Sequence, residues 1–186
     1  MPHIMSAPPA APQEDLPPLT LVLGGARSGK STYAEKLLAG YPSKIYLATG
    51  FAGDAEMAER IAHHQARRGP DWITVEEPQD LIGALRRHAR PGRPILVDCL
   101  TLWLTNLLLA EADIEARTVH LADNLPGLPG PVVFVANEVG MGIVPDNALS
   151  RRFRDHAGWI NQAVAARCQR VVFVAAGLPL VLKDCR

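Results

Sequence analysis

The sequence predicts an α/β fold: a doubly wound, mostly parallel sheet with helices on both faces. Short apolar runs alternate with stretches of helical character along the chain, which is the pattern of a parallel sheet that is buried on both sides. A glycine-rich turn joins the first apolar run to the first helical stretch. With 186 residues the chain has the length of about one domain and can bury a sizeable core.

The expected elements follow in order. The first buried strand is expected over 19–23, followed by a helix over 31–39 that Gly40 ends, and the second strand covers 44–49. The remaining expected elements are a helix over 54–68, a strand over 72–76, a helix over 80–89, a strand over 95–98, a helix from about 100 to 110, a strand over 132–136, a helix over 147–167, a strand over 171–175 and a strand over 180–182. A Gly-Leu-Pro turn separates the last two strands, which predicts an antiparallel hairpin at the C-terminal edge of the sheet.

Composition narrows the class of protein. Hydrophobic residues make up 48% and charged residues 20%, as in globular domains. The 19 basic side chains equal the 19 acidic ones, so no net positive field would hold nucleic acid, and no nucleic-acid partner is expected. The longest apolar-rich stretch, 99–110, is far short of the roughly 20 residues that span a bilayer, so no membrane span is expected.

The N-terminal residues differ in composition from the rest. Residues 1–16 are rich in proline and alanine without periodicity, which predicts a disordered leader before a single domain over 17–186. The lack of a basic region argues against a signal peptide. Cys99, Cys168 and Cys185 are odd in number and form no Cys-x-x-Cys pair, which favours a reducing compartment, and we expect a cytoplasmic protein.

The glycine-rich turn carries the clearest chemical motif. Residues 24–31 read GGARSGKS and match G-x-x-x-x-G-K-[ST], with a predicted strand before and a helix after. Backbone N–H groups of such a loop face a phosphate chain at the helix N-terminus. Lys30 would bring its charge to the β- and γ-phosphates and Ser31 would bind Mg²⁺. The alternative, a turn that only connects strand and helix, is less favoured, and the motif predicts a P-loop NTPase (RecA-like) fold.

A P-loop site also needs an acidic residue at the end of another buried strand. Asp98 follows the apolar run 95–97 and fits this role, holding Mg²⁺ directly or through water. Its alternative role is to cap the helix that follows.

Two histidines lie on the expected helix over 54–68. At about 100° per residue, His64 falls with the apolar side chains and His63 towards solvent. A histidine on an apolar face is more often a packed core residue than a catalyst. However, Arg67 and Arg68 follow and can bind phosphate oxygens, and a neutral imidazole can form a nucleotidyl adduct.

Six segments together resemble one family, the bifunctional adenosylcobinamide kinase/adenosylcobinamide-phosphate guanylyltransferases, and the likeness extends over 19–183. They are GGARSGKS at 24–31, YLATG at 46–50, RIAHHQARRG at 60–69, TLWLTNLL at 101–108, NEVGMGIVPDNALSRRFRD at 137–155 and GWINQAVA at 158–165. The combination of NEVGMGIVP with a histidine pair is far more specific than the phosphate loop.

The resemblance implies a two-activity enzyme of cobalamin nucleotide-loop assembly. One activity phosphorylates the aminopropanol hydroxyl of adenosylcobinamide with ATP or GTP. The other transfers GMP from GTP to that phosphate through a guanylylated histidine and releases pyrophosphate. By similarity this histidine is His64, with His63 as the fallback. Relatives assemble as trimers, so a homo-oligomer is expected.

The resemblance also implies a set of guanine nucleotide contacts. They are Gly24, Gly25, Ala26, Arg27, Ser28, Gly29, Lys30, Ser31, Ala48, Thr49, Gly50, Gln65, Ala66, Arg67, Arg68, Glu76 and Asp98. Without the resemblance, Glu76 would be interpreted as a solvated carboxylate at a strand end. The segment 137–146 is expected to face the substrate because it follows a strand of an open α/β sheet, with a merely tight connection as the alternative. The segment 111–130 looks shorter than in some relatives, which leaves its helix arrangement open.

Two other functions remain as alternatives on the residues alone. The first is a plain small-molecule kinase with structural histidines. The second is a nucleotide-switched binding module or an oligomeric ATPase. That class needs a water-activating residue or an arginine finger supplied in trans, and no motif in the sequence identifies either, although Arg27 is one arginine that could act in trans.

Overall fold

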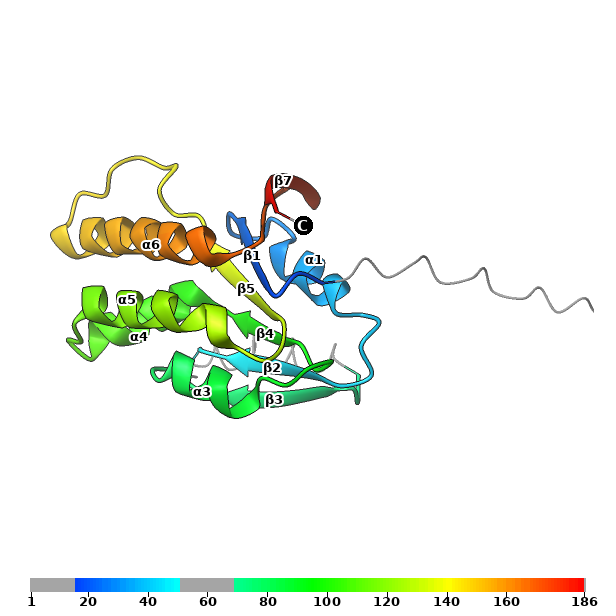
Figure 1. Cartoon of the computed structure of the whole chain (residues 1–186). Helices are drawn as coiled ribbons and strands as arrows, with labels where there is room; N and C mark the ends of the chain where they lie inside the picture. The colour runs from blue at the N-terminus through cyan, green and yellow to red at the C-terminus, as the bar shows by residue number, and fades with distance from the viewer. Residues whose placement is uncertain (1–15, 51–68, 186) are drawn as a thin grey trace, which may run out of the picture.

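A computed structural model describes residues 16–50 and 69–185 of the chain (Figure 1). Residues 1–15 of the expected leader and the expected helix over 54–68 lie outside the described residues. Leu16 is partly buried and packs against the core.

The described strands form one sheet in the order β3-β2-β4-β5-β1-β6-β7. Their bounds are β1 Leu19–Gly24, β2 Lys44–Ala48, β3 Trp72–Glu76, β4 Ile95–Asp98, β5 Val132–Asn137, β6 Arg170–Ala175 and β7 Leu178–Asp184. All neighbouring pairs are parallel except β6 and β7, which are antiparallel. The expected mostly parallel sheet with an antiparallel C-terminal edge is thereby confirmed.

Helices cover both faces of this sheet (Figure 1). Their bounds are α1 Lys30–Leu37, α3 Leu81–His88, α4 Leu100–Leu109, α5 Ile114–Asn124 and α6 Ala148–Arg167, with a 3₁₀ turn, η1, at Leu125–Gly127. Successive side chains along each strand point to opposite faces of the sheet. In β1, Leu21 packs in the cluster that includes α3 to α6, and Val22 packs with Ala34 and Leu38 on the side of α1.

Helix α5 was not among the elements expected from the sequence. The Asp113 carboxylate caps it by accepting a hydrogen bond of 2.9 Å from the backbone N–H of Ala116. Ile114, Thr118 and Leu121 are buried at helical spacing and join α5 to the core. The last strand is also longer than expected, because β7 runs over Leu178–Asp184. Within 16–50 and 69–185, no helix combines the length and apolarity needed to cross a membrane.

Candidate functional site

The parallel strands end at one edge of the sheet, and their register aligns several predicted site residues there. Ala48 at the end of β2 pairs with Glu76 of β3 and with Asp98 of β4. Gly24, where the phosphate loop begins, pairs with Asn137 of β5. In open α/β sheets this edge is where ligands bind. Residues far apart in the sequence therefore meet at a single edge beside the phosphate loop.

The phosphate loop turns through left-handed backbone conformations. Arg27 has a φ of 56° and Gly29 a φ of 93°, and α1 begins at Lys30. A Cβ on Gly29 would lie 3.1 Å from the Cα of Gly177, so this position needs glycine for space as well as conformation. The backbone N–H of Gly177 donates a 2.8 Å hydrogen bond to the carbonyl of Ser28. The turn between β6 and β7 therefore supports the phosphate loop from behind.

The polar groups within the loop fit an anionic ligand. The Lys30 Nζ donates to the carbonyl of Gly25 at 3.1 Å, which holds the ammonium group over the loop. The Ser28 hydroxyl oxygen is buried and has no hydrogen-bond partner among the described residues. Since a buried polar group without a partner is costly, a phosphate oxygen is a fitting partner for this hydroxyl. The N-terminus of α1 adds its partial positive charge.

Asp98 ends β4 and is held in place by a tyrosine that the sequence analysis did not single out. The hydroxyl of Tyr46 donates a 2.8 Å hydrogen bond to Asp98 Oδ2. Helix α1, which carries Ser31 in its first turn, packs near β4 as well as β1. A serine hydroxyl and a carboxylate are the hard oxygen ligands that Mg²⁺ prefers, so these residues fit a magnesium ion.

The Thr49 side chain links two strand ends at this edge of the sheet. Its hydroxyl donates to the carbonyl of Cys99 at 2.7 Å and accepts from the backbone N–H of Cys99 at 2.9 Å. The Asn106 side-chain amide donates to the Thr49 carbonyl at 2.7 Å. The Thr49 side chain thus joins the ends of β2 and β4, next to Gly50, which is half-buried.

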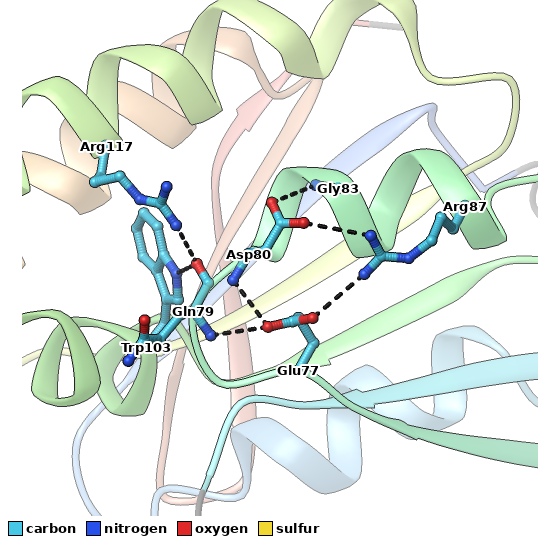
Figure 2. A network of polar contacts seen from close by, with 7 residues as sticks. All are labelled: Glu77, Gln79, Asp80, Gly83, Arg87, Trp103 and Arg117. Carbon is cyan, nitrogen blue, oxygen red and sulfur yellow. Dashed lines mark hydrogen bonds and ion pairs between the residues drawn. The ribbon is translucent and has the colours of Figure 1, made fainter. Parts of the chain in front are cut away.

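Glu76 is exposed at the end of β3, and the residues after it are tightly fixed (Figure 2). The Glu77 carboxylate accepts hydrogen bonds from the backbone N–H groups of Gln79 and Asp80 and pairs with Arg87. The Gln79 carbonyl accepts from the Trp103 indole at 2.9 Å and from the side chain of Arg117 at 2.8 Å. This network fixes the chain that follows Glu76 and leaves its carboxylate open to a ligand.

Cys99 lies between Asp98 and α4 and carries no nucleophilic role. Burial, and secondly the charge of Asp98, raise the pKa of its thiol to about 11. A thiol with a pKa this high is not ionised near neutral pH and is a poor nucleophile. Cys99 is therefore part of the core.

The segment after β5 adjoins the phosphate loop. The backbone N–H of Glu138 donates to the carbonyl of Gly24 at 3.0 Å, and that of Asn137 donates to the Thr101 hydroxyl at 2.8 Å. Further along, Met141 and Ile143 are exposed. A largely apolar cavity of about 290 Å³ lies nearby, lined by Thr105, Leu108, Leu109, Leu149, Ser150 and Phe153. The segment thus connects the loop to an apolar surface between α4 and α6.

The structure places the described members of the predicted site along one edge: residues 24–31, Ala48, Thr49, Gly50, Glu76 and Asp98. The predicted residues His63, His64, Gln65, Ala66, Arg67 and Arg68 lie outside the described residues. The described arrangement has the features of a phosphate-binding edge, with a serine and a carboxylate of the kind that hold a divalent cation.

Comparisons with known proteins agree on one family. Residues 20–182 match the family described as "Cobinamide kinase / cobinamide phosphate guanyltransferase". The chain is 53% identical over 166 residues to the bifunctional adenosylcobalamin biosynthesis protein CobP of Pseudomonas aeruginosa, covering 88% of this chain and 96% of that protein. It is 39% identical over 180 residues to the CobU protein of Escherichia coli, covering 89% and 99%.

Similar solved structures support the fold alone. An ATPase from the type III secretion system of pathogenic bacteria matches with a TM-score of 0.57 at 10% identity, covering 89% of this chain and 57% of the ATPase. A Pyrococcus horikoshii protein, Project ID PH0250, matches with a TM-score of 0.54 at 9% identity, covering 92% and 88%. Together with the phosphate loop and strand order, the likeness to an ATPase confirms the P-loop NTPase fold.

Proposed function

The chain belongs to the cobinamide kinase / cobinamide phosphate guanyltransferase family, and from this premise we propose which residues perform each activity. The protein is a bifunctional transferase of cobalamin biosynthesis, a kinase and a guanylyltransferase. We propose that it phosphorylates the aminopropanol hydroxyl of adenosylcobinamide with ATP or GTP. It then transfers GMP from GTP to the new phosphate, which gives adenosylcobinamide-GDP and pyrophosphate.

The observation that best supports this proposal is the phosphate loop at the carboxyl edge, with a buried, unpartnered Ser28 hydroxyl inside it. Backbone N–H groups of residues 24–31 bind the phosphate chain. Lys30, already drawn over the loop by its bond to the Gly25 carbonyl, brings its charge to the β- and γ-phosphates. These interactions hold the nucleotide while the acceptor approaches from the open edge.

Ser31 and Asp98 are the residues proposed to hold Mg²⁺. When bound there, the ion neutralises phosphate charge. The hydrogen bond from Tyr46 keeps the Asp98 carboxylate at the edge, with one of its oxygens oriented. Asp98 is half-buried, so its charge is less screened by water than that of a surface carboxylate.

His64 is proposed as the guanylyl acceptor. Its neutral imidazole attacks the α-phosphorus of GTP, the bond to the pyrophosphate leaving group breaks, and the substrate phosphate later displaces the histidine. Gln65, Ala66, Arg67 and Arg68 are proposed to contact the nucleotide beside it. Glu76, exposed at the end of β3, is proposed to accept hydrogen bonds from the ribose or the guanine edge.

The segment 137–146 is proposed to face the corrinoid. It is bonded to the Gly24 carbonyl at the start of the phosphate loop through the backbone N–H of Glu138, and it then presents Met141 and Ile143 to solvent. Ile143 is 97% exposed, and such a side chain gains from contact with a large, partly apolar ligand. The apolar cavity between α4 and α6 extends the same surface.

We further propose a homo-oligomer, a trimer by resemblance, that acts in the cytoplasm. Strand β7 supports self-association. It is the edge of the sheet, and its Leu178, Leu180, Val181 and Leu182 are each more than half exposed. An exposed apolar edge strand offers both backbone pairing and hydrophobic area to another copy of the chain.

The test is a stepwise reaction with purified protein. Adenosylcobinamide and ATP should give a product heavier by one phosphate, and later addition of GTP should add GMP and release pyrophosphate. Intact mass of the protein after GTP alone should show a covalent GMP adduct. A corrinoid that gains phosphate without any later gain of GMP would contradict the proposal and favour a plain kinase.

A further inference from the structure

Glu138 is an acidic residue at the site, and its carboxylate has no chemical role in the assignments above. It is the first residue beyond β5, and its backbone N–H donates to the carbonyl of Gly24 at 3.0 Å. Strand β5 lies between β1 and β4, and its register pairs Asn137 with Gly24 and Val135 with Asp98. The chain therefore leaves the sheet at Glu138, between the phosphate loop after β1 and Asp98, the proposed magnesium ligand at the end of β4.

The Glu138 side chain is half-buried and held from one side. Its Oε1 accepts a 2.6 Å hydrogen bond from the backbone N–H of Gly140. Within the part of the chain that the structure describes, no cation pairs with this carboxylate. A carboxylate can accept several hydrogen bonds, so Glu138 retains capacity for another donor.

The other acidic side chains at this edge either have hydrogen-bond partners already or lie farther from the phosphate loop. Asp98 accepts from Tyr46, and Glu77 accepts two backbone hydrogen bonds and pairs with Arg87. Glu76 ends β3, which β2, β4 and β5 separate from β1. Glu138 follows β5 directly and bonds through its backbone N–H to the carbonyl of Gly24, where the phosphate loop begins. Among the described residues, no ion pair engages its side chain.

We propose that Glu138 is the general base of the kinase reaction. In the step, the hydroxyl oxygen of cobinamide forms a bond to the γ-phosphorus and the bond from that phosphorus to the β–γ bridging oxygen breaks. The hydroxyl proton passes to the Glu138 carboxylate and is then released to water, and the nucleoside diphosphate leaves. The assignment rests on the proposed function and extends it, because it names the group that receives the acceptor's proton.

The location of Glu138 suits this task for a simple reason. The phosphate loop holds the nucleotide from the β1 end, so the acceptor hydroxyl must reach the γ-phosphate from outside the carboxyl edge. Glu138 is the second residue of the segment 137–146, which is proposed to face the corrinoid. The same segment would thus bind the acceptor and take its proton, while the guanylyl step, in which a phosphate attacks, needs no such base.

The test compares Glu138→Gln with the wild-type protein. Glutamine keeps an oxygen that can accept from Gly140 and loses the basicity, so it separates proton transfer from support of the loop. General base catalysis contributes roughly 100-fold or more. We therefore expect Glu138→Gln to lower the kcat of phosphorylation by about 100-fold with little change in the KM for ATP. Glu115→Gln, the same change at an exposed position in the first turn of α5, should leave kcat unchanged.

The guanylyl activity of the same samples provides the second readout. Glu138→Gln should still form the GMP adduct, seen by intact mass, and should still transfer GMP to cobinamide that wild-type protein has already phosphorylated. Glu138→Asp keeps a carboxylate one methylene shorter and should phosphorylate faster than Glu138→Gln.

Four results would overturn the assignment. A wild-type kcat in Glu138→Gln would show that Glu138 only stabilises its loop and takes no proton from the acceptor. An equal loss of both activities, or Glu138→Asp no faster than Glu138→Gln, would show that no base is involved. A wild-type protein that forms the GMP adduct but phosphorylates no cobinamide would contradict the kinase half of the proposed function itself, and the assignment would fall with it.

Discussion

The hydroxyl of Tyr46 donates a 2.8 Å hydrogen bond to the Oδ2 of Asp98, joining side chains 52 positions apart in the sequence. Tyr46 lies within β2 and Asp98 ends the neighbouring β4. Tyr46 is only 6% exposed, so the bond is sheltered from water on the tyrosine side. It gives the proposed magnesium ligand a fixed orientation before any nucleotide arrives.

Replacing Tyr46 by phenylalanine should therefore affect both stability and metal use. A buried hydrogen bond to a carboxylate contributes about 1.5 kcal/mol, and Tyr46→Phe should lower the free energy of unfolding by about that amount in urea titrations. The Mg²⁺ concentration for half-maximal phosphorylation should rise, because the carboxylate loses its orientation. Tyr33→Phe is the matched control, since the Tyr33 hydroxyl makes no hydrogen bond with any described residue. Equal effects of the two changes would contradict the argument.

Lys30→Ala should disable phosphorylation while leaving the fold intact. The substitution removes the charge proposed to meet the β- and γ-phosphates, and we expect kcat to fall on the order of 100-fold or more. Lys30 bonds to its own loop at the Gly25 carbonyl, so the urea midpoint should change little. Lys36→Ala, in the last turn of the same helix and exposed, serves as the control. Phosphorylation at the wild-type rate by Lys30→Ala would remove the loop lysine from the mechanism.

The three cysteines should differ sharply in reactivity. Burial raises the pKa of Cys99 to about 11 and that of Cys168 to about 12, whereas Cys185 is exposed. N-ethylmaleimide on native protein at neutral pH should therefore add one label, at Cys185, as peptide mass mapping would reveal. Rapid labelling of Cys99 under these conditions would show that the end of β4 opens.

The raised pKa values of Cys99 and Cys168 should make the free energy of unfolding decrease at high pH. Both pKa values are raised above the usual 9.0, so the native state holds these protons more tightly than the unfolded chain does. Their contribution is fully present below pH 9 and is lost as the pH rises through about 11 and 12. Cys99→Ser and Cys168→Ser proteins should show a smaller loss of stability between pH 8 and 11 than wild type.

The sequence predicted what depends on local patterns. The phosphate loop is a contiguous motif between a strand and a helix, and Asp98 ends an apolar run, so both were found without knowledge of the fold. Helix α5 was not predicted, because the segment 111–130 looked shorter than in some relatives and its helix arrangement was left open. Its buried Ile114, Thr118 and Leu121 gave a signal that a search for helical spacing would have found.

Contacts between residues on different strands could not be predicted from the sequence, and the reason is physical. The bond between Tyr46 and Asp98 and that between Glu138 and Gly24 depend on strand order and register. A shift of one residue would turn each side chain to the other face of the sheet. Only the assembled order β2-β4-β5-β1 brings these residues to one edge.

His64→Ala should separate the two activities. The guanylyl step needs a nucleophile for the α-phosphorus of GTP, whereas the kinase step passes the γ-phosphoryl group directly to the corrinoid hydroxyl and does not need an imidazole. We expect His64→Ala to abolish the GMP adduct and the guanylyl product while phosphorylation continues near the wild-type rate. Since only neutral imidazole is nucleophilic, adduct formation by wild type should weaken as the pH falls and the imidazole becomes protonated. His63→Ala is the matched control and should keep both activities. An adduct that survives in His64→Ala and disappears in His63→Ala would move the role to His63, and loss of both activities in a folded His64→Ala protein would refute the division between the two sites.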